Sequence, residues 1–351
     1  MLHRHGGDIY TYGKVYDFSA NINFRGMPEP VRSAAVQAVD ASVHYPDPEY
    51  RTLRRALAGR EGIAQTDHMI CGNGAAELMF ALSAAYRPKN ALLAAPSFFE
   101  YEQALASSGC AVRRFCLKKE DGFEITGQFL DAIDETTDCM ILGNPNNPTG
   151  RTLSGKFLEE LLRICRERGI LLVMDESFFD FLSEEDRAGT FSCAERTAEY
   201  ENLFVIKSFT KMYAMPGLRF GYGICGNKKL LEKMHTVMQP WNVSVPAAQA
   251  AQAAASETAF AEETAIQTRK NREALSGALL QAGYRVYPSS ANFLLFEGPE
   301  DLQDFCLEHG FLIRDCSNFP GLARGFFRIC VRSREENEKI LNVLWRAKEN
   351  G

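Results

Sequence analysis

An uninterrupted apolar run most constrains how this chain of 351 residues can fold. Residues 169–180 read G-I-L-L-V-M-D-E-S-F-F-D, without the polar–apolar alternation of a strand that has one exposed face. Such a run predicts a strand buried on both faces, as in a parallel sheet covered by helices. Similar runs in residues 68–77, 138–150 and 202–211 each lead into a turn. Because open α/β sheets bind ligands at the carboxyl ends of their strands, we expect the ligand-binding and reactive side chains to lie in these turns.

The turn after the last of these runs carries an amine beside phosphate-binding groups. Residues 205–223 place Lys211 just after the hydroxyls of Ser208 and Thr210, and eight residues before Arg219. An amine forms a Schiff base with an aldehyde, whereas hydroxyls and a guanidinium bind phosphate. Pyridoxal phosphate (PLP) carries both an aldehyde and a phosphate, so the segment predicts a PLP site. Taken alone, Lys211 is equally well read as a solvated loop lysine.

Two other strand ends supply complementary groups. Asp175, after the first apolar run, would pair with the protonated pyridine nitrogen of PLP. The glycine turn in residues 68–77 leads into a predicted helix, whose first backbone N–H groups would bind the phosphate. The residues of that turn are Gly72, Asn73, Gly74 and Ala75.

Strand and helix signals alternate over residues 69–238, which predicts a mostly parallel sheet wrapped by helices. The length suits a large and a small domain rather than one core. In the C-terminal part, residues 247–283 predict one long helix, and residues 284–287 and 292–296 predict strands.

Four motifs, N-P-N-N-P-T-G, D-E-S-F, S-F-T-K and G-L-R-F-G-Y, follow one another in the order and at the spacings of a known family. The chain resembles the fold-type I PLP-dependent enzymes of the class I and II aminotransferase superfamily over nearly its whole length. The resemblance implies an α/β large domain with a mostly parallel sheet flanked by helices, plus a smaller α+β C-terminal domain. It implies an N-terminal arm over residues 1–30, a large domain over 31–243 and a small domain over 244–351.

The resemblance also assigns roles around the cofactor. It implies that Lys211 binds PLP covalently, that Asn147 donates to the 3′ oxygen and that Phe98 stacks on the ring. Phe99, beside it, would pack in the core. Tyr45, in a Y-P-D-P segment, would reach the PLP phosphate of a neighbouring subunit, so a homodimer is expected.

Four further residues are expected to bind the substrate. By resemblance, Arg328 binds the α-carboxylate in a bidentate fork, and Arg314 binds a side-chain phosphate. The alternative for Arg314 is a bracing contact to an acidic neighbour such as Asp315. His5 and Asn21, in the arm, would close over the site, although a surface histidine and ordinary turn chemistry explain them equally well.

Details of sequence select a branch of the superfamily. H-G-G in residues 5–7, D-F-S-A-N-I-N in residues 17–23, and Phe178 where many aminotransferases have tyrosine are similar to the threonine-phosphate decarboxylases of cobalamin biosynthesis. The expected activity is decarboxylation of L-threonine O-3-phosphate to aminopropanol phosphate. Histidinol-phosphate aminotransferase is the close alternative and a related amino-acid aminotransferase the third. A non-catalytic PLP-binding regulator, which would carry an added DNA-binding domain, is the remote alternative.

Trp241 is expected either to pack at a hinge or to line the pocket.

Composition excludes several other classes. The formal net charge is −6 and no basic run occurs, which argues against a nucleic-acid partner. The ten cysteines include no C-x-x-C pair, which predicts reduced thiols in a cytoplasmic protein and no metal site. The first residues lack the apolar region of a signal peptide, and no apolar run approaches membrane-spanning length. The resemblance described above implies a small-molecule substrate, an amino acid or a phosphorylated amino acid.

Overall fold

The computed structural model describes residues 5–349 and is built on a seven-stranded sheet in the order β2-β8-β7-β6-β5-β3-β4. All neighbouring strands are parallel except β8, which is antiparallel to both β2 and β7. This confirms the predicted mostly parallel sheet. The strands are β2 (Met69–Gly72), β3 (Asn90–Ala95), β4 (Ala111–Cys116), β5 (Cys139–Gly143), β6 (Leu171–Asp175), β7 (Leu203–Ser208) and β8 (Gly221–Ile224).

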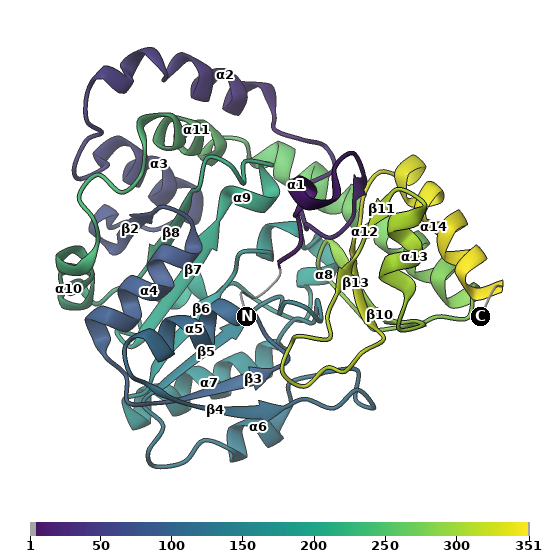
Figure 1. Ribbon diagram of the computed structural model, residues 1–351. Helices are drawn as coiled ribbons and strands as arrows, with labels where there is room; N and C mark the ends of the chain where they lie inside the picture. The colour runs from purple at the N-terminus through teal and green to yellow at the C-terminus, as the bar shows by residue number, and fades with distance from the viewer. Residues whose placement is uncertain (1–4, 350–351) are drawn as a thin grey trace.

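The central strands are buried because helices cover both faces of the sheet (Figure 1). On β6, Leu172 and Met174 enter one core, whereas Leu171 and Val173 enter the other, as the two-residue period of a strand requires. One face packs against α3 (Arg51–Glu61), α7 (Gly155–Arg168) and α11 (Val245–Ala255). The opposite face packs against α4 (Ala75–Tyr86), α5 (Phe99–Ser107) and α10 (Lys228–Val237). The remaining short elements of this part are α2 (Glu29–Gln37), α6 (Gly127–Asp131), α8 (Glu184–Arg187) and α9 (Phe209–Met212), with 3₁₀ turns η1 (Asp40–Val43), η2 (Thr66–His68), η3 (Phe179–Phe181) and η4 (Cys193–Arg196).

The C-terminal part has its own antiparallel sheet in the order β12-β13-β10-β9 and its own apolar core (Figure 1). Its strands are β9 (Arg285–Val286), β10 (Phe293–Glu297), β12 (Arg314–Asp315) and β13 (Phe326–Cys330). Its helices are α12 (Thr258–Gln281), α13 (Leu302–Glu308) and α14 (Arg334–Glu349). The strands expected in residues 284–287 and 292–296 are confirmed as β9 and β10. The exact limits of the arm, the large domain and the small domain remain predictions.

The single long helix predicted over residues 247–283 is wrong. The chain forms α11 and α12, which are separated at Ser256 and Glu257. The two helices have different neighbours, since α11 packs on α2 and α3, whereas α12 packs on η3 and α14. The chain therefore turns where it leaves one core for the other, and this tertiary requirement overrides the continuous helical propensity of the Ala-rich run.

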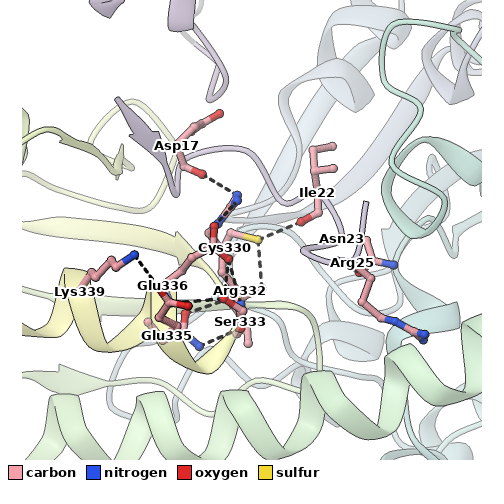
Figure 2. A network of polar contacts seen from close by, with 12 residues as sticks. Asp17, Ile22, Asn23, Arg25, Cys330, Arg332, Ser333, Glu335, Glu336 and Lys339 are labelled. Atoms are coloured by element: carbon pink, nitrogen blue, oxygen red, sulfur yellow. Dashed lines mark hydrogen bonds and ion pairs between the residues drawn. The ribbon is translucent and has the colours of Figure 1, made fainter. Parts of the chain in front are cut away.

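The N-terminal segment is attached to the C-terminal part. After α1 (Ile9–Tyr12), β1 (Tyr16–Asp17) pairs in parallel with β11 (Phe311–Leu312). Figure 2 shows the polar contacts that continue this attachment: Arg332 Nη1 donates to the Asp17 carbonyl at 3.2 Å, and Cys330 Sγ donates to the Ile22 carbonyl at 3.5 Å. Glu336 accepts from the same guanidinium at 2.7 Å. The arm is thus held against the C-terminal part, where β1 and β11 form a two-stranded sheet of their own. No helix within residues 5–349 is long and apolar enough to cross a membrane.

Candidate active site

A cavity of about 200 Å³ lies where the strand ends, the arm and the smaller sheet meet. Its wall combines segments that are hundreds of residues apart in sequence, from Gly6 in the arm to Arg328 on β13. Twelve residues proposed from the sequence line it: His5, Asn21, Ala75, Phe98, Asn147, Asp175, Ser208, Thr210, Lys211, Arg219, Arg314 and Arg328. Four others, Gly72, Asn73, Gly74 and Tyr45, are not in the wall.

Lys211 is a buried amine in α9, a four-residue helix capped by the Ser208 hydroxyl, which accepts from the Thr210 N–H at 3.2 Å. Burial, reinforced by the charges of Arg328 and Arg219, lowers the pKa of Lys211 to about 8. A substantial fraction of this amine is consequently neutral near physiological pH. A neutral amine is the form that attacks a carbonyl carbon.

Asp175 ends β6 at the bottom of the cavity and is held by two donors. The Tyr101 hydroxyl donates to Oδ2 at 2.8 Å, and the Ser177 backbone N–H donates to Oδ1 at 2.9 Å. Burial raises the pKa of Asp175, while the hydrogen bonds from Ser177 and Tyr101 oppose that rise. The sequence did not predict a role for Tyr101. Its place in S-F-F-E-Y, next to the loop that carries Phe98, could have indicated that it lies near the site.

Removing the Tyr101 hydroxyl tests this arrangement. We expect Tyr101→Phe to lower the free energy of unfolding by about 1–3 kcal/mol, because a buried carboxylate oxygen loses its donor. Denaturant unfolding measures the loss, with Tyr86→Phe as the control, since Tyr86 is 37% exposed at the end of α4. Equal stability of the two variants would show that the hydroxyl does not hold Asp175.

The glycine turn before α4 shapes the cavity without lining it. Gly74 has φ of +85°, and a Cβ there would lie 2.6 Å from Arg219 Nη2. Gly74 is therefore required for the Arg219 side chain to lie across the start of α4. Ala75, the first residue of that helix, does reach the cavity. Asn73 instead donates its backbone N–H to Glu77 Oε2 at 2.6 Å.

The hydroxyls predicted to bind phosphate line the same cavity as Arg219. Ser208 Oγ and Thr210 Oγ1 both donate to the Phe220 carbonyl at 3.3 Å. Arg219 has φ of +61° and donates to the Pro216 carbonyl at 3.3 Å. The segment thus presents two hydroxyls and a guanidinium beside the N-terminus of α4, a combination that suits a phosphate.

Two arginines form a pair on the wall contributed by the smaller sheet. Arg314 on β12 and Arg328 on β13 are direct cross-strand partners, and both are buried. Like charges placed opposite each other in a sheet repel, and burial, reinforced by Arg314, lowers the pKa of Arg328 to about 10. We call Arg314 and Arg328 the arginine pair. Such a pair is stabilised when anions bind between or beside the guanidinium groups.

The contacts of Arg328 link the two sheets. It donates from Nη1 to Asn147 Oδ1 and from Nη2 to the Ser19 carbonyl at 2.8 Å. Its Nε is buried and has no hydrogen-bond partner among the described residues. The sequence missed Ser19, which connects the arm to Arg328, because that contact spans 309 residues of chain.

Arg314 is held by residues that follow it in the same loop. It donates to the Asp315 carbonyl oxygen and, at 2.9 Å, to Asn318 Oδ1, and its guanidinium lies 5.3 Å from the centre of the Phe319 ring. The Asp315 carboxylate accepts from the Ser317 N–H and hydroxyl at 2.8 and 2.9 Å. Among the described residues, Arg314 therefore contacts the carbonyl of Asp315 and not its carboxylate, and the choice between phosphate binding and bracing stays a prediction.

Phenylalanine rings also line the cavity. Phe98 precedes α5 and meets the Tyr101 ring edge-on at 5.6 Å. Phe99, expected in the core, also lines the cavity, and packs at 4.8 Å on Phe319. Phe178 lines the cavity as well, in contact with Phe293 at 5.0 Å.

Two polar residues of the arm reach the cavity. His5 Nε2 lies 3.4 Å from Glu100 Oε1. Asn21 is buried, and its Oδ1 has no hydrogen-bond partner among residues 5–349. Both residues thus lie in the cavity wall, and their closing role stays a prediction.

Tyr45 lies outside the cavity of its own chain. Its side chain is 76% exposed, and its ring stacks on Trp241 at 4.3 Å. From the sequence, Trp241 is expected either to pack at a hinge or to line the pocket. It does not line the cavity that contains Lys211; its side chain is 44% exposed and packs against Tyr45. An exposed Tyr45 is what a contact to a second subunit requires.

Comparison with known proteins agrees with this architecture. The sequence profile of the aminotransferase class I and II family matches residues 13–344. A threonine-phosphate decarboxylase of Salmonella typhimurium strain LT2 is 35% identical over 352 residues, covering 97% of this chain and 95% of that protein. The crystal structure of a histidinol-phosphate aminotransferase from Clostridium acetobutylicum has a TM-score of 0.88 at 30% identity, covering 96% of this chain and 100% of that one. That of an L-threonine-O-3-phosphate decarboxylase from Porphyromonas gingivalis has a TM-score of 0.85 at 27% identity, covering 95% and 100%. The chain belongs to the aminotransferase class I and II family, whose structural relatives are fold-type I PLP enzymes.

Proposed function

We propose that this protein is a PLP-dependent decarboxylase of L-threonine O-3-phosphate. The observation that carries the proposal is the arginine pair, which lines the same cavity as Lys211. Two buried guanidinium groups beside one amine suit an amino acid with two anionic groups, a carboxylate and a phosphate. The Salmonella relative, named for the same activity, supports this choice.

The residues of the cavity fit PLP. Lys211 offers a partly neutral buried amine, and Asp175 a buried carboxylate fixed by two donors. Ser208, Thr210 and Arg219, with the start of α4, would hold the phosphate, while Asn147 and Phe98 would contact the ring. Bound PLP supplies an electron sink for the bond that breaks at the substrate Cα.

The protein side chains then determine which bond breaks. Arg328 binds the α-carboxylate and Arg314 the phosphate, so the substrate is held at both ends. Holding both ends would fix which bond at Cα breaks, and for decarboxylation this is the bond from Cα to the carboxylate. Lys211 Nζ then delivers a proton to Cα after carbon dioxide has left.

Phe178 bears on the same choice. It lies in the cavity where many related aminotransferases have tyrosine, and a phenyl ring cannot donate a hydrogen bond. The sequence D-E-S-F resembles the decarboxylase branch, so Phe178 supports decarboxylation.

Histidinol-phosphate aminotransferase is the second candidate, because the Clostridium structure of that name superposes with a TM-score of 0.88. The two activities are separated by assaying the purified holoenzyme on L-threonine O-3-phosphate alone and on histidinol phosphate with 2-oxoglutarate. The proposal expects the higher kcat/KM on threonine phosphate, without any requirement for an oxo acid. A higher kcat/KM on histidinol phosphate would replace the proposed function with the second candidate.

We further propose a homodimer in which Tyr45 contacts the cofactor phosphate of the partner. Tyr45 stands beside other exposed apolar side chains, including Val39 at 60% and Val43 at 81% exposure. Sedimentation should give the mass of a dimer. Tyr45→Phe should leave that mass unchanged but weaken PLP retention about ten-fold or more, because one hydrogen bond to a charged group is lost.

The control for this prediction is Tyr10→Phe, since Tyr10 is 94% exposed in α1. A monomer with full activity at micromolar concentration would show that Tyr45 has been assigned the wrong role. Unchanged PLP retention in the Tyr45→Phe dimer would lead to the same conclusion.

A further inference from the structure

Glu100 is an acidic group in the cavity wall for which the proposed reaction has no role. It lies in the first turn of α5, and its side chain is 16% exposed. Oε1 contacts His5 Nε2 at 3.4 Å. Oε2 is buried and has no hydrogen-bond partner among the described residues. A carboxylate oxygen left in this state is costly unless it carries a proton or meets a ligand.

An ionised Glu100 would repel a phosphate bound at the same end of the cavity, because both groups are anionic. Glu100 and Arg314 lie close enough for each charge to shift the pKa of the other. A phosphate bound to Arg314 would therefore be repelled by a Glu100 carboxylate in the wall of the same cavity. The neutral carboxylic acid has the opposite effect, since its O–H donates a strong hydrogen bond to an anionic oxygen.

We propose that Glu100 binds the second anion of the substrate as a hydrogen-bond donor from Oε2, beside Arg314, and takes up one proton from solvent as that anion binds. This rests on the proposed function, because the second anion is the substrate phosphate. Glu100 then distinguishes phosphorylated from non-phosphorylated substrates together with Arg314.

The charged groups around Glu100 set the direction of the pH dependence. His5 faces it from the arm, Asp175 from β6, Lys211 from α9 and Arg314 from β12, while Tyr101 follows it on α5. Burial raises the pKa of Glu100 to about 7; Lys211 and Arg314 oppose this rise, and Asp175 adds to it. Because the bound state requires the proton, affinity for the anion is complete below that pKa and falls as the pH rises above it.

The test measures binding to the holoenzyme by titration calorimetry. The probe is 3-phosphoglycerate, which carries a carboxylate and a phosphate but no amine, and glycerate is its matched control without phosphate. Two buffers of different ionisation enthalpy give the number of protons taken up. We expect uptake approaching one proton per site for 3-phosphoglycerate above pH 7, and an affinity that falls by up to about ten-fold per pH unit between about pH 7 and 9.

Glu100→Gln is the decisive variant, because the amide keeps the size and can donate a hydrogen bond at every pH. It should abolish proton uptake and flatten the pH profile, while 3-phosphoglycerate still binds. His5→Gln is the control for the imidazole that contacts Glu100 Oε1, and it should retain the uptake. Absence of uptake in the wild-type protein, or an unchanged pH profile in Glu100→Gln, overturns the proposal.

Three other results separate this proposal from the proposed function. Loss of uptake in His5→Gln but not in Glu100→Gln would assign the proton to His5 and overturn the role of Glu100 alone. Binding of 3-phosphoglycerate no tighter than that of glycerate would overturn both the role of Glu100 and the phosphorylated substrate. Binding of 3-phosphoglycerate that depends on Arg314 but involves no proton uptake leaves the proposed function intact and rejects Glu100 as the donor.

Discussion

Lys211→Ala is expected to lower kcat by at least about 10⁴-fold and to remove the visible absorbance of the holoenzyme. The reason is that the amine has two tasks in the proposed mechanism: it binds the cofactor aldehyde and moves a proton at the substrate Cα. Binding the aldehyde needs the neutral amine and proton delivery needs the protonated one; both forms are accessible because burial and two neighbouring arginines lower its pKa to about 8. Absorption spectra of protein purified with PLP, together with turnover assays, measure the effect.

Lys207, four residues earlier, is the matched control. Its side chain is buried, and its amine lies 2.8 Å from Glu61 and 3.6 Å from Glu176, so these carboxylates raise its pKa against the effect of burial. We expect Lys207→Met to destabilise the fold by about 3–5 kcal/mol, because two buried carboxylates lose their cation. The folded fraction should still bind PLP. Visible absorbance and turnover that survive in Lys211→Ala would contradict the proposed mechanism.

Arg314→Ala is expected to weaken binding of threonine phosphate by about 30-fold or more, which corresponds to the lower end of about 2–5 kcal/mol for a buried charged contact. Threonine, which lacks the phosphate, should be affected little. Arg328→Ala should instead impair every substrate that carries an α-carboxylate. Histidinol phosphate, which has no carboxylate, should therefore respond to Arg314→Ala much more than to Arg328→Ala.

The measurement is kcat/KM for threonine and threonine phosphate in both variants. Arg332→Ala is the control, since Arg332 contacts Asp17 and Glu336 in the attachment of the arm and does not line the cavity (Figure 2). Equal losses for threonine and threonine phosphate in Arg314→Ala would identify Arg314 as a structural brace. The phosphorylated substrate would then lose its main support.

Most of the fold could be predicted because its strands are buried on both faces. The run that ends in Asp175 has apolar residues facing two cores, and only a covered parallel sheet explains that pattern. The end of α11 could not be predicted in the same way. The Ala-rich run carries little local information, and the turn at Ser256 follows from the different packing of α11 and α12.

The candidate site was predictable where one motif supplies a group, as with Lys211, Arg219 and Asn147. It was not predictable where two distant segments meet. Nothing in the spacing of Arg314 and Arg328 shows that they are direct cross-strand partners. The Tyr101 contact to Asp175 and the unpartnered oxygen of Glu100 likewise depend on how α5 packs beside β6.

The fate of the substrate carboxyl carbon tests the central claim most directly. The holoenzyme would be given L-threonine O-3-phosphate labelled with carbon-13 in the carboxyl group, without any oxo acid. The account predicts release of the label as carbon dioxide in a one-to-one ratio with aminopropanol phosphate, and loss of both products in Lys211→Ala. Retention of the label in a 2-oxo acid, formed only when an amino acceptor is supplied, would contradict decarboxylation and identify the protein as an aminotransferase.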